Sequence, residues 1–183
     1  QPDLDRFFQH YAGQNQFKLH LAVTYVAASD SRILVFATVA ASSLERNRLP
    51  SARLRRRLPG YPLPVLRLAR LGVHARVQGS GVGRVLLRHV LGLALDQRDR
   101  LGCVGVVADA KSDAIAFYAR YGFVPLEGVR EGALVIQLGR LGRLDAFDLD
   151  FENRGLAGEM LGAVFLGKGH VDVLFVSGGD AHQ

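Results

Sequence analysis

Apolar positions along the first forty residues change from helical to strand spacing. Residues 4–12 carry apolar side chains three and four positions apart, which predicts a short amphipathic helix ending at Gly13. Apolar and polar positions then alternate over 19–25, as they do in a half-buried strand. A polar turn at 29–31 separates this segment from a second β-rich run at 33–39. The pattern therefore predicts a β-hairpin.

The pattern breaks between residues 42 and 64, a stretch rich in arginine and proline. An exposed loop with a short helical turn near 52–58 explains this composition. A basic arm directed at phosphate groups explains it equally well. The pattern at this point does not choose between the two.

A strand, a glycine-rich loop, a helix and a second strand follow. The strand is predicted at 65–73, and its alternation changes phase near the middle, as in a β-bulge or in a strand buried on both faces. The helix is predicted at 82–95, and the polar residues 96–102 are expected to turn the chain. The valine-rich run at 103–110 predicts a buried central strand.

The next segment contains the signals of a capped helix. Ser112 is the expected N-cap of a helix that runs through Tyr121, and Gly122 is expected to end it in the left-handed conformation. Segments 123–126 and 133–138 then predict two strands joined by a glycine-containing loop.

The last 45 residues do not continue this order of elements. We predict one domain at 1–138 and a C-terminal extension at 139–183, with a helix around 156–166 and a strand at 171–176. A dimerisation element, a cover for a sheet edge and a poorly ordered extension are equally compatible with its composition.

Composition and charge limit the class of protein. Hydrophobic residues make up 49% and charged residues 22%, which indicates a folded chain, and no apolar run approaches the roughly 20 residues of a membrane span. The single cysteine, Cys103, excludes an internal disulfide, a zinc knuckle and an iron–sulfur cluster, so no metal site is expected, and it fits a reducing cytosol. The net charge is +6, and only three of the 23 basic residues are lysine. This arginine excess fits either a GC-rich genome or a phosphate-rich partner.

The loop between the strand and the helix carries the candidate chemistry. Gly79, Gly81 and Gly83 allow a sharp turn that directs several backbone N–H groups to one point at the start of a helix. A pyrophosphate is a natural guest of such a loop. A dinucleotide fingerprint does not fit, because Arg84 follows Gly83, and no Gly-Lys-Ser or Gly-Lys-Thr of a P-loop occurs.

Two motifs in this order resemble those of the GCN5-related N-acetyltransferase (GNAT) family. The loop Gln78-Gly79-Ser80-Gly81-Val82-Gly83 is similar to the family's coenzyme A pyrophosphate loop, and 116–123 (Ala-Phe-Tyr-Ala-Arg-Tyr-Gly-Phe) is similar to its A-x-x-F-Y-x-x-x-G-F block. Segments 4–16, 24–26 and 68–73 further resemble the TacT-like branch of bacterial toxins, with Gly72 in place of the usual alanine. The resemblance covers about 3–138 and implies that the family's first strand is missing from the start.

The resemblance implies an α/β (α+β) fold with a mixed central sheet, a splayed strand pair that binds acetyl-CoA, and flanking helices. It implies that Tyr118 is the general acid that protonates the coenzyme A thiolate. The residues that it places against acetyl-CoA are Leu71, Gly72, Val73, Gln78, Gly79, Ser80, Gly81, Val82, Gly83 and Arg84. His74 is the best ionisable candidate for a base, although an esterified α-amine has enough neutral form at pH 7 to attack without one.

The same branch acetylates the α-amine of aminoacyl-tRNA and is restrained by a ribbon-helix-helix antitoxin, so we expect both partners, with a homodimer also open. Arginines are expected to position the tRNA phosphates. The candidates are Arg46, Arg48, Arg53, Arg55, Arg56, Arg57 and Arg76, with Arg84 beside the cofactor loop. The alternatives are an acetyltransferase for a small amine or a protein N-terminus, and a non-catalytic nucleic-acid-binding or regulatory module.

Overall fold

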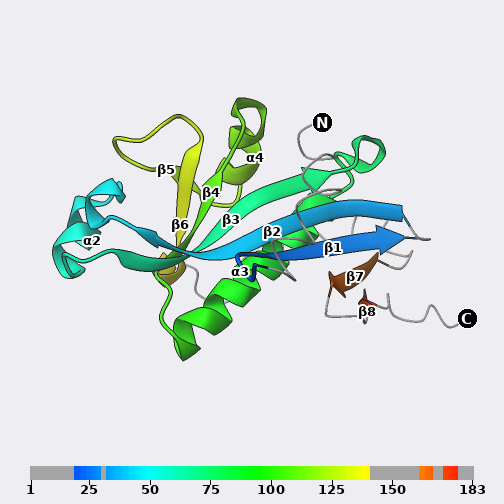
Figure 1. Ribbon diagram of the computed structural model, residues 1–183. Helices are drawn as coiled ribbons and strands as arrows, with labels where there is room; N and C mark the ends of the chain where they lie inside the picture. Colours follow the sequence, from blue (N-terminus) through cyan, green and yellow to red (C-terminus); the bar gives the residue numbers. More distant parts are fainter. Residues whose placement is uncertain (1–18, 30–31, 141–160, 167–170, 177–183) are drawn as a thin grey trace, which may run out of the picture. The chain divides into compact units, whose positions relative to one another are not determined.

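The computed structural model describes residues 19–29, 32–140, 161–166 and 171–176 (Figure 1). The helix predicted at 4–12 lies outside these residues. The chain forms two compact units. One comprises Gln1–Thr38, Leu71–Arg88 and Asp148–Gln183, and the other comprises Val39–Arg70 and His89–Phe147. Three elements contribute residues to both: β2 (Arg32–Leu44), β3 (Leu63–Val73) and α3 (Val82–Arg100).

The described strands form one mixed sheet in the order β5-β6-β4-β3-β2-β1-β7-β8. Strands β3 and β4 pair in parallel, with Leu66 opposite Val106. The pairs β4–β6, β5–β6, β1–β7 and β7–β8 are antiparallel. This mixture, with helices between the strands, confirms the predicted α/β class.

The first unit contains β1 (Val23–Ser29), the first part of β2 (Arg32–Leu44), β7 (Leu161–Leu166) and β8 (Val171–Val176). Strand β1 confirms the first predicted strand in part, and β2 is longer than predicted. The strand predicted at 171–176 is confirmed. The helix predicted around 156–166 is wrong at its end, because 161–166 pair with β1 on one side and β8 on the other. A short apolar run fits both the helical and the strand period, so its pairing with neighbouring strands decides which structure it forms.

The second unit is built around β4 (Gly105–Asp109), which lies between β3 (Leu63–Val73) and β6 (Ala133–Gln137). Val106 and Ala108 are buried, as predicted for a central strand. Gly105 permits close pairing, because a Cβ there would lie 2.6 Å from the carbonyl oxygen of Ile136. The strand β5 (Val124–Pro125) pairs with β6, which confirms the predicted pair of strands.

Strand β3 confirms the strand predicted at 65–73. Its buried residues move from one face of the sheet to the other near the start of the strand, between Val65 and Leu66. Val65 and Leu66 are both buried, after which Leu68 and Gly72 continue the face of Leu66. Two adjacent buried residues indicate a strand covered on both faces at this point, and the predicted phase change near the middle of the strand is absent.

Helix α3 (Val82–Arg100) continues five residues past its predicted end. The segment 96–100 was predicted to turn the chain because it is polar, yet a helix at the surface tolerates polar residues that do not pack. Arg98 and Arg100 lie in the last turn, where positive charge complements the helix dipole. The N–H groups of Leu101 and Gly102 both donate to the carbonyl of Gln97, and Gly102 adopts φ 88°. The helix therefore ends at glycine, as helices commonly do.

The segment before Tyr118 begins as a 3₁₀ turn. Ser112 lies inside η5 (Ser112–Ala114), and α4 (Ile115–Ala119) follows, so the predicted Ser112 N-cap is wrong. Lys111 precedes the turn instead, and its carbonyl accepts from the N–H of Ala114. Gly122 has φ 84° and ends this segment as predicted. Within the described part of the chain, no helix is both long and apolar enough to cross a membrane.

Candidate active site

The glycine-rich loop joins the short 3₁₀ helix η4 (Ala75–Val77) to the start of α3, within the first unit. Gly79 has φ 80° and Gly81 has φ 95°, conformations that residues with a side chain rarely adopt. A Cβ at either position would meet no heavy atom within 4 Å. The two glycines are therefore required by the path of the backbone, and the space in front of them is open.

The backbone amides of this loop divide into two groups. The N–H of Ser80 donates to the carbonyl of Val77 at 3.3 Å, and the N–H of Arg84 donates to the carbonyl of Gly81 at 2.9 Å. Four other N–H groups donate to no acceptor among the described residues, and these belong to Gly79, Gly81, Val82 and Gly83. Four of the loop's amides are thus open donors at a helix N-terminus, whereas the amide of Arg84, which the resemblance also places against the cofactor, is used within the loop.

The polar side chains of the loop hold it in place. The Gln78 amide donates to the carbonyl of Val73 at 3.3 Å and ties the loop to the end of β3. The Ser80 hydroxyl donates to the carbonyl of Val77 at 2.6 Å. His74 Nδ1 accepts from the N–H of Arg76 at 3.3 Å, so the neutral ring carries its proton on Nε2 and its basic nitrogen is engaged by the loop. Because these side chains bond to the backbone, anion binding in the loop depends on the open amides.

The end of β3, where the acetyl group is expected, packs tightly at one residue. Leu71 and Val73 are half-buried, whereas Gly72 is buried. A Cβ on Gly72 would lie 2.5 Å from Cε1 of Phe36, a β2 residue that is itself buried. The Phe36 ring therefore occupies the space of the alanine side chain that the resemblance leads one to expect here.

We expect Gly72→Ala to lower the free energy of unfolding by about 1–3 kcal/mol, because an added methyl group in a packed core forces its neighbours to move. Gly72→Ala combined with Phe36→Leu should recover part of the loss. Gly60→Ala is the matched control, since a Cβ there meets nothing within 4 Å. Urea unfolding of the four proteins measures the effect, and wild-type stability of Gly72→Ala would contradict the steric explanation.

Tyr118 lies on α4 in the second unit, with its ring in an aromatic cluster. The ring is edge-to-face with Phe117 at 5.2 Å and with Phe123 at 5.3 Å between centroids. Only 5% of the residue is exposed, and burial raises the pKa of its phenol above the usual 10.0. The phenol is therefore protonated throughout the neutral range, as a general acid must be before it acts.

The hydroxyl of Tyr118 is accessible although its ring is buried. No side-chain oxygen or nitrogen that is fully buried lacks a hydrogen-bond partner in the described part of the chain. The Tyr118 hydroxyl makes no hydrogen bond there, so its oxygen is not completely covered. The packing thus fixes the ring and leaves its proton available.

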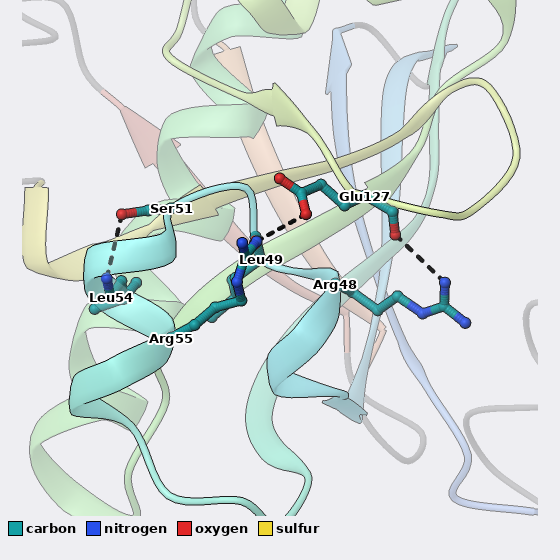
Figure 2. A network of polar contacts seen from close by, with 6 residues as sticks. All are labelled: Arg48, Leu49, Ser51, Leu54, Arg55 and Glu127. Atoms are coloured by element: carbon teal, nitrogen blue, oxygen red, sulfur yellow. Dashed lines mark hydrogen bonds and ion pairs between the residues drawn. The ribbon is translucent and has the colours of Figure 1, made fainter.

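The predicted arginine arm is a pair of short helices, η3 (Arg46–Arg48) and α2 (Ala52–Arg57). The short helical turn predicted near 52–58 is confirmed, and Ser51 caps α2 through the N–H of Leu54 (Figure 2). Half of the arm's arginines bond within the second unit. Arg46 donates to the carbonyl of Leu58 at 2.9 Å, and Arg48 donates to the carbonyl of Gly128.

Arg55 makes the most extensive of these contacts. It donates to the carbonyl of Leu49 and forms an ion pair with Glu127 at 2.8 Å (Figure 2). The Glu127 N–H also donates to the carbonyl of Arg48 at 2.9 Å. We call this set of contacts among Arg48, Arg55, Glu127 and Gly128 the clasp. Sequence reasoning missed Glu127, because nothing in the pattern relates it to a helix 72 residues earlier.

The other arginines of α2 have a different environment. Arg53, Arg56 and Arg57 are exposed and make no hydrogen bond or ion pair among the described residues. Arg76, on η4, is exposed too, and its side chain bonds to none of the described residues. Of the residues predicted to bind tRNA, Arg53, Arg56, Arg57 and Arg76 are thus available for a ligand, whereas Arg46, Arg48 and Arg55 hold the arm.

Comparison with known proteins identifies relatives of this chain. Residues 20–125 match the family model described as "Acetyltransferase (GNAT) domain". A tRNA-acetylating toxin of Mycobacterium tuberculosis (strain ATCC 25618 / H37Rv) is 32% identical over 124 residues, which cover 67% of this chain and 73% of the toxin.

Solved structures of related proteins show the same fold. AtaT complexed with acetyl-methionyl-tRNAfMet has a TM-score of 0.70 and 25% identity, over 76% of this chain and 84% of AtaT. AtaTR bound with AcCoA has a TM-score of 0.62 and 25% identity, over 81% of this chain and 85% of that chain. The family match, which spans the loop and Tyr118, shows that the chain belongs to the GNAT acetyltransferase family.

Proposed function

We propose that this protein is an acetyl-CoA-dependent N-acetyltransferase that modifies the α-amine of aminoacyl-tRNA and so blocks translation. The observation that carries the proposal is the 32% identity to a tRNA-acetylating toxin over two thirds of the chain. The solved relative AtaT, in complex with acetyl-methionyl-tRNAfMet, supports the same acceptor.

The loop supports acetyl-CoA as the donor. Four amides without an acceptor, at the N-terminus of a 19-residue helix, offer hydrogen bonds and a positive dipole end to the pyrophosphate. The protein needs no lysine there, and none is present in the loop. We further propose that Leu71, Gly72 and Val73 at the end of β3 lie against acetyl-CoA.

Tyr118 is the proposed general acid. In the transfer, the amine nitrogen bonds to the acetyl carbon, the carbon–sulfur bond breaks, and the Tyr118 hydroxyl gives its proton to the departing sulfur. The amine loses a proton to water, since an α-amine with a pKa of roughly 7.7–8.0 is substantially neutral at pH 7 and above. His74 is the second candidate for that proton, which its Nδ1 would take in place of the hydrogen bond from the N–H of Arg76.

The proposal extends to a partner and a location. A relative was solved as AtaTR, which we take as support for an antitoxin of this protein, here of the ribbon-helix-helix type. Aminoacyl-tRNA is a cytoplasmic substrate, so the proposed activity places the protein in the cytoplasm.

The test is acetyl transfer from radiolabelled acetyl-CoA to three acceptors: charged tRNA, uncharged tRNA and free amino acids. We expect label only on charged tRNA, and alkaline hydrolysis of the ester should release an N-acetyl amino acid. Equal or better transfer to free amines would favour a small-molecule acetyltransferase. Acetyl-CoA binding without transfer to any acceptor would favour a non-catalytic module.

A further inference from the structure

We propose that a surface of α2 and the loop after it binds single-stranded RNA, with arginines on phosphates and a tyrosine stacked on an unpaired base. We define this α2 surface as Arg53, Arg56, Arg57 and Tyr61. The inference rests on the proposed function, because it assigns residues that would hold the RNA part of an aminoacyl-tRNA substrate.

The three arginines share one face of the helix. Positions i, i+3 and i+4 are neighbours on a helix surface, and Arg53, Arg56 and Arg57 have this spacing. All three are exposed and bond to none of the described residues. Like charges at this spacing repel each other, and the nearby carboxylate of Glu127 is paired with Arg55. In the described part of the chain, no carboxylate therefore pairs with the positive charges of this face. This favours a polyanion as its partner.

The helix that carries these arginines is held in place. Leu54 and Leu58 pack against the buried cluster that contains Leu49 and Leu63. On the side of α2 opposite the three arginines, the clasp holds the helix through the ion pair of Arg55 and Glu127 (Figure 2). A six-residue helix is marginal alone, so these contacts give it a fixed orientation. A helix that is already held in place loses less backbone freedom when a ligand binds.

Tyr61 provides the second element of the surface. It is 65% exposed, and it is four residues beyond Arg57, within about 14 Å at full extension. Pro59 and Pro62 fix their own φ angles on either side of Gly60 and Tyr61, and Pro62 disfavours the helical conformation at Tyr61. Leu63, 1% exposed, anchors the end of this loop. The ring is therefore presented to solvent on a short segment whose end is anchored in the core.

The combination of arginines and an exposed ring favours single-stranded RNA. Arginine charge alone suits any polyanion, including duplex RNA and an acidic peptide. A tyrosine ring gains most from an unpaired base, whose flat face is free to stack, whereas bases inside a duplex are already stacked on their neighbours. This difference distinguishes the proposed ligand from the other two.

The test is binding of the full chain to a fluorescent single-stranded RNA about seven nucleotides long, measured by anisotropy at several salt concentrations. Tyr61→Ala should weaken binding about 10-fold or more, and Tyr61→Phe less than about twofold, because phenylalanine still stacks. The triple variant Arg53→Gln, Arg56→Gln, Arg57→Gln should reduce the slope of log K against log salt by about 0.7 for each phosphate that it no longer neutralises.

A matched control removes the same charge elsewhere. Arg98→Gln, Arg100→Gln, Arg120→Gln also neutralises three exposed arginines, of which Arg98 is paired with Asp99, and should leave most of the affinity and slope intact. Equal losses in the two triple variants, or an unchanged affinity of Tyr61→Ala, would overturn the proposal. Tighter binding of the same sequence as a duplex, or of an acidic peptide alone, would also overturn it.

The outcome is separable from the proposed activity. If charged tRNA is acetylated and the α2 variants keep the wild-type KM, the surface assignment fails while the function stands. If the α2 surface binds the RNA but no charged tRNA is acetylated, the function fails while the surface stands.

Discussion

Gly81→Asp is expected to weaken the binding of acetyl-CoA by more than about 100-fold, whereas Gly81→Asn should weaken it only about 10-fold. Both side chains enter the same open space in front of the loop, and both share the strain of φ 95°. They differ by one negative charge beside the expected pyrophosphate. Repulsion at about 4 Å lies between about 1 kcal/mol in water and about 4 kcal/mol near a protein surface, and the additional tenfold loss requires about 1.4 kcal/mol.

Calorimetry with acetyl-CoA measures the two affinities, and thermal unfolding shows that both variants are folded. A carboxylate near a helix N-terminus is favourable for folding, so instability does not explain a loss specific to Gly81→Asp. The difference between the variants should narrow as salt is added, because an exposed loop is screened. Equal affinities of the Asp and Asn variants would remove the pyrophosphate from this loop.

The strands and helices that carry the loop could be predicted because their signals are local. The loop stands where strand spacing changes to helical spacing, and β3 and α3 begin close to the predicted positions. The end of α3 could not be predicted, since polarity at 96–100 is shared by turns and by the exposed last turn of a helix. The helix predicted around 156–166 failed for a different reason. There the pairing of β7 with the distant strand β1 determines the structure.

At the candidate site, the arginines too have contacts with distant segments that sequence alone could not predict. Their number and spacing predicted a basic arm, and the structure confirms the short helix. Sequence could not separate Arg55, which pairs with Glu127, from Arg56, which faces solvent. That division depends on a contact between distant segments. A variant that neutralises Arg55, Arg56 and Arg57 together would therefore mix disruption of the clasp with removal of exposed charge, so the two sets have to be tested apart.

Tyr118→Phe is expected to lower kcat by about 100-fold or more, with acetyl-CoA affinity unchanged. The substitution keeps the ring and its contacts with Phe117 and Phe123, and removes only the proton donor. Steady-state kinetics with charged tRNA and calorimetry with acetyl-CoA give the two quantities. Unchanged kcat across neutral pH would make Tyr118 a packing residue and place the acid elsewhere.

The raised pKa of Tyr118 gives this prediction a second readout. Because burial holds the phenol protonated above pH 10, wild-type kcat should show no descending limb from this group between about pH 7 and 9. The unfolded chain ionises this phenol near pH 10.0, so the folded protein should lose stability as the pH rises above that value. Tyr118→Phe removes this ionisation, and its unfolding free energy should fall less between about pH 9.5 and about pH 11. If the unfolding free energies of the two proteins fell in parallel above about pH 9.5, the Tyr118 phenol would not be desolvated. A phenol of ordinary pKa would instead predict that kcat of the wild-type protein begins to fall near about pH 9.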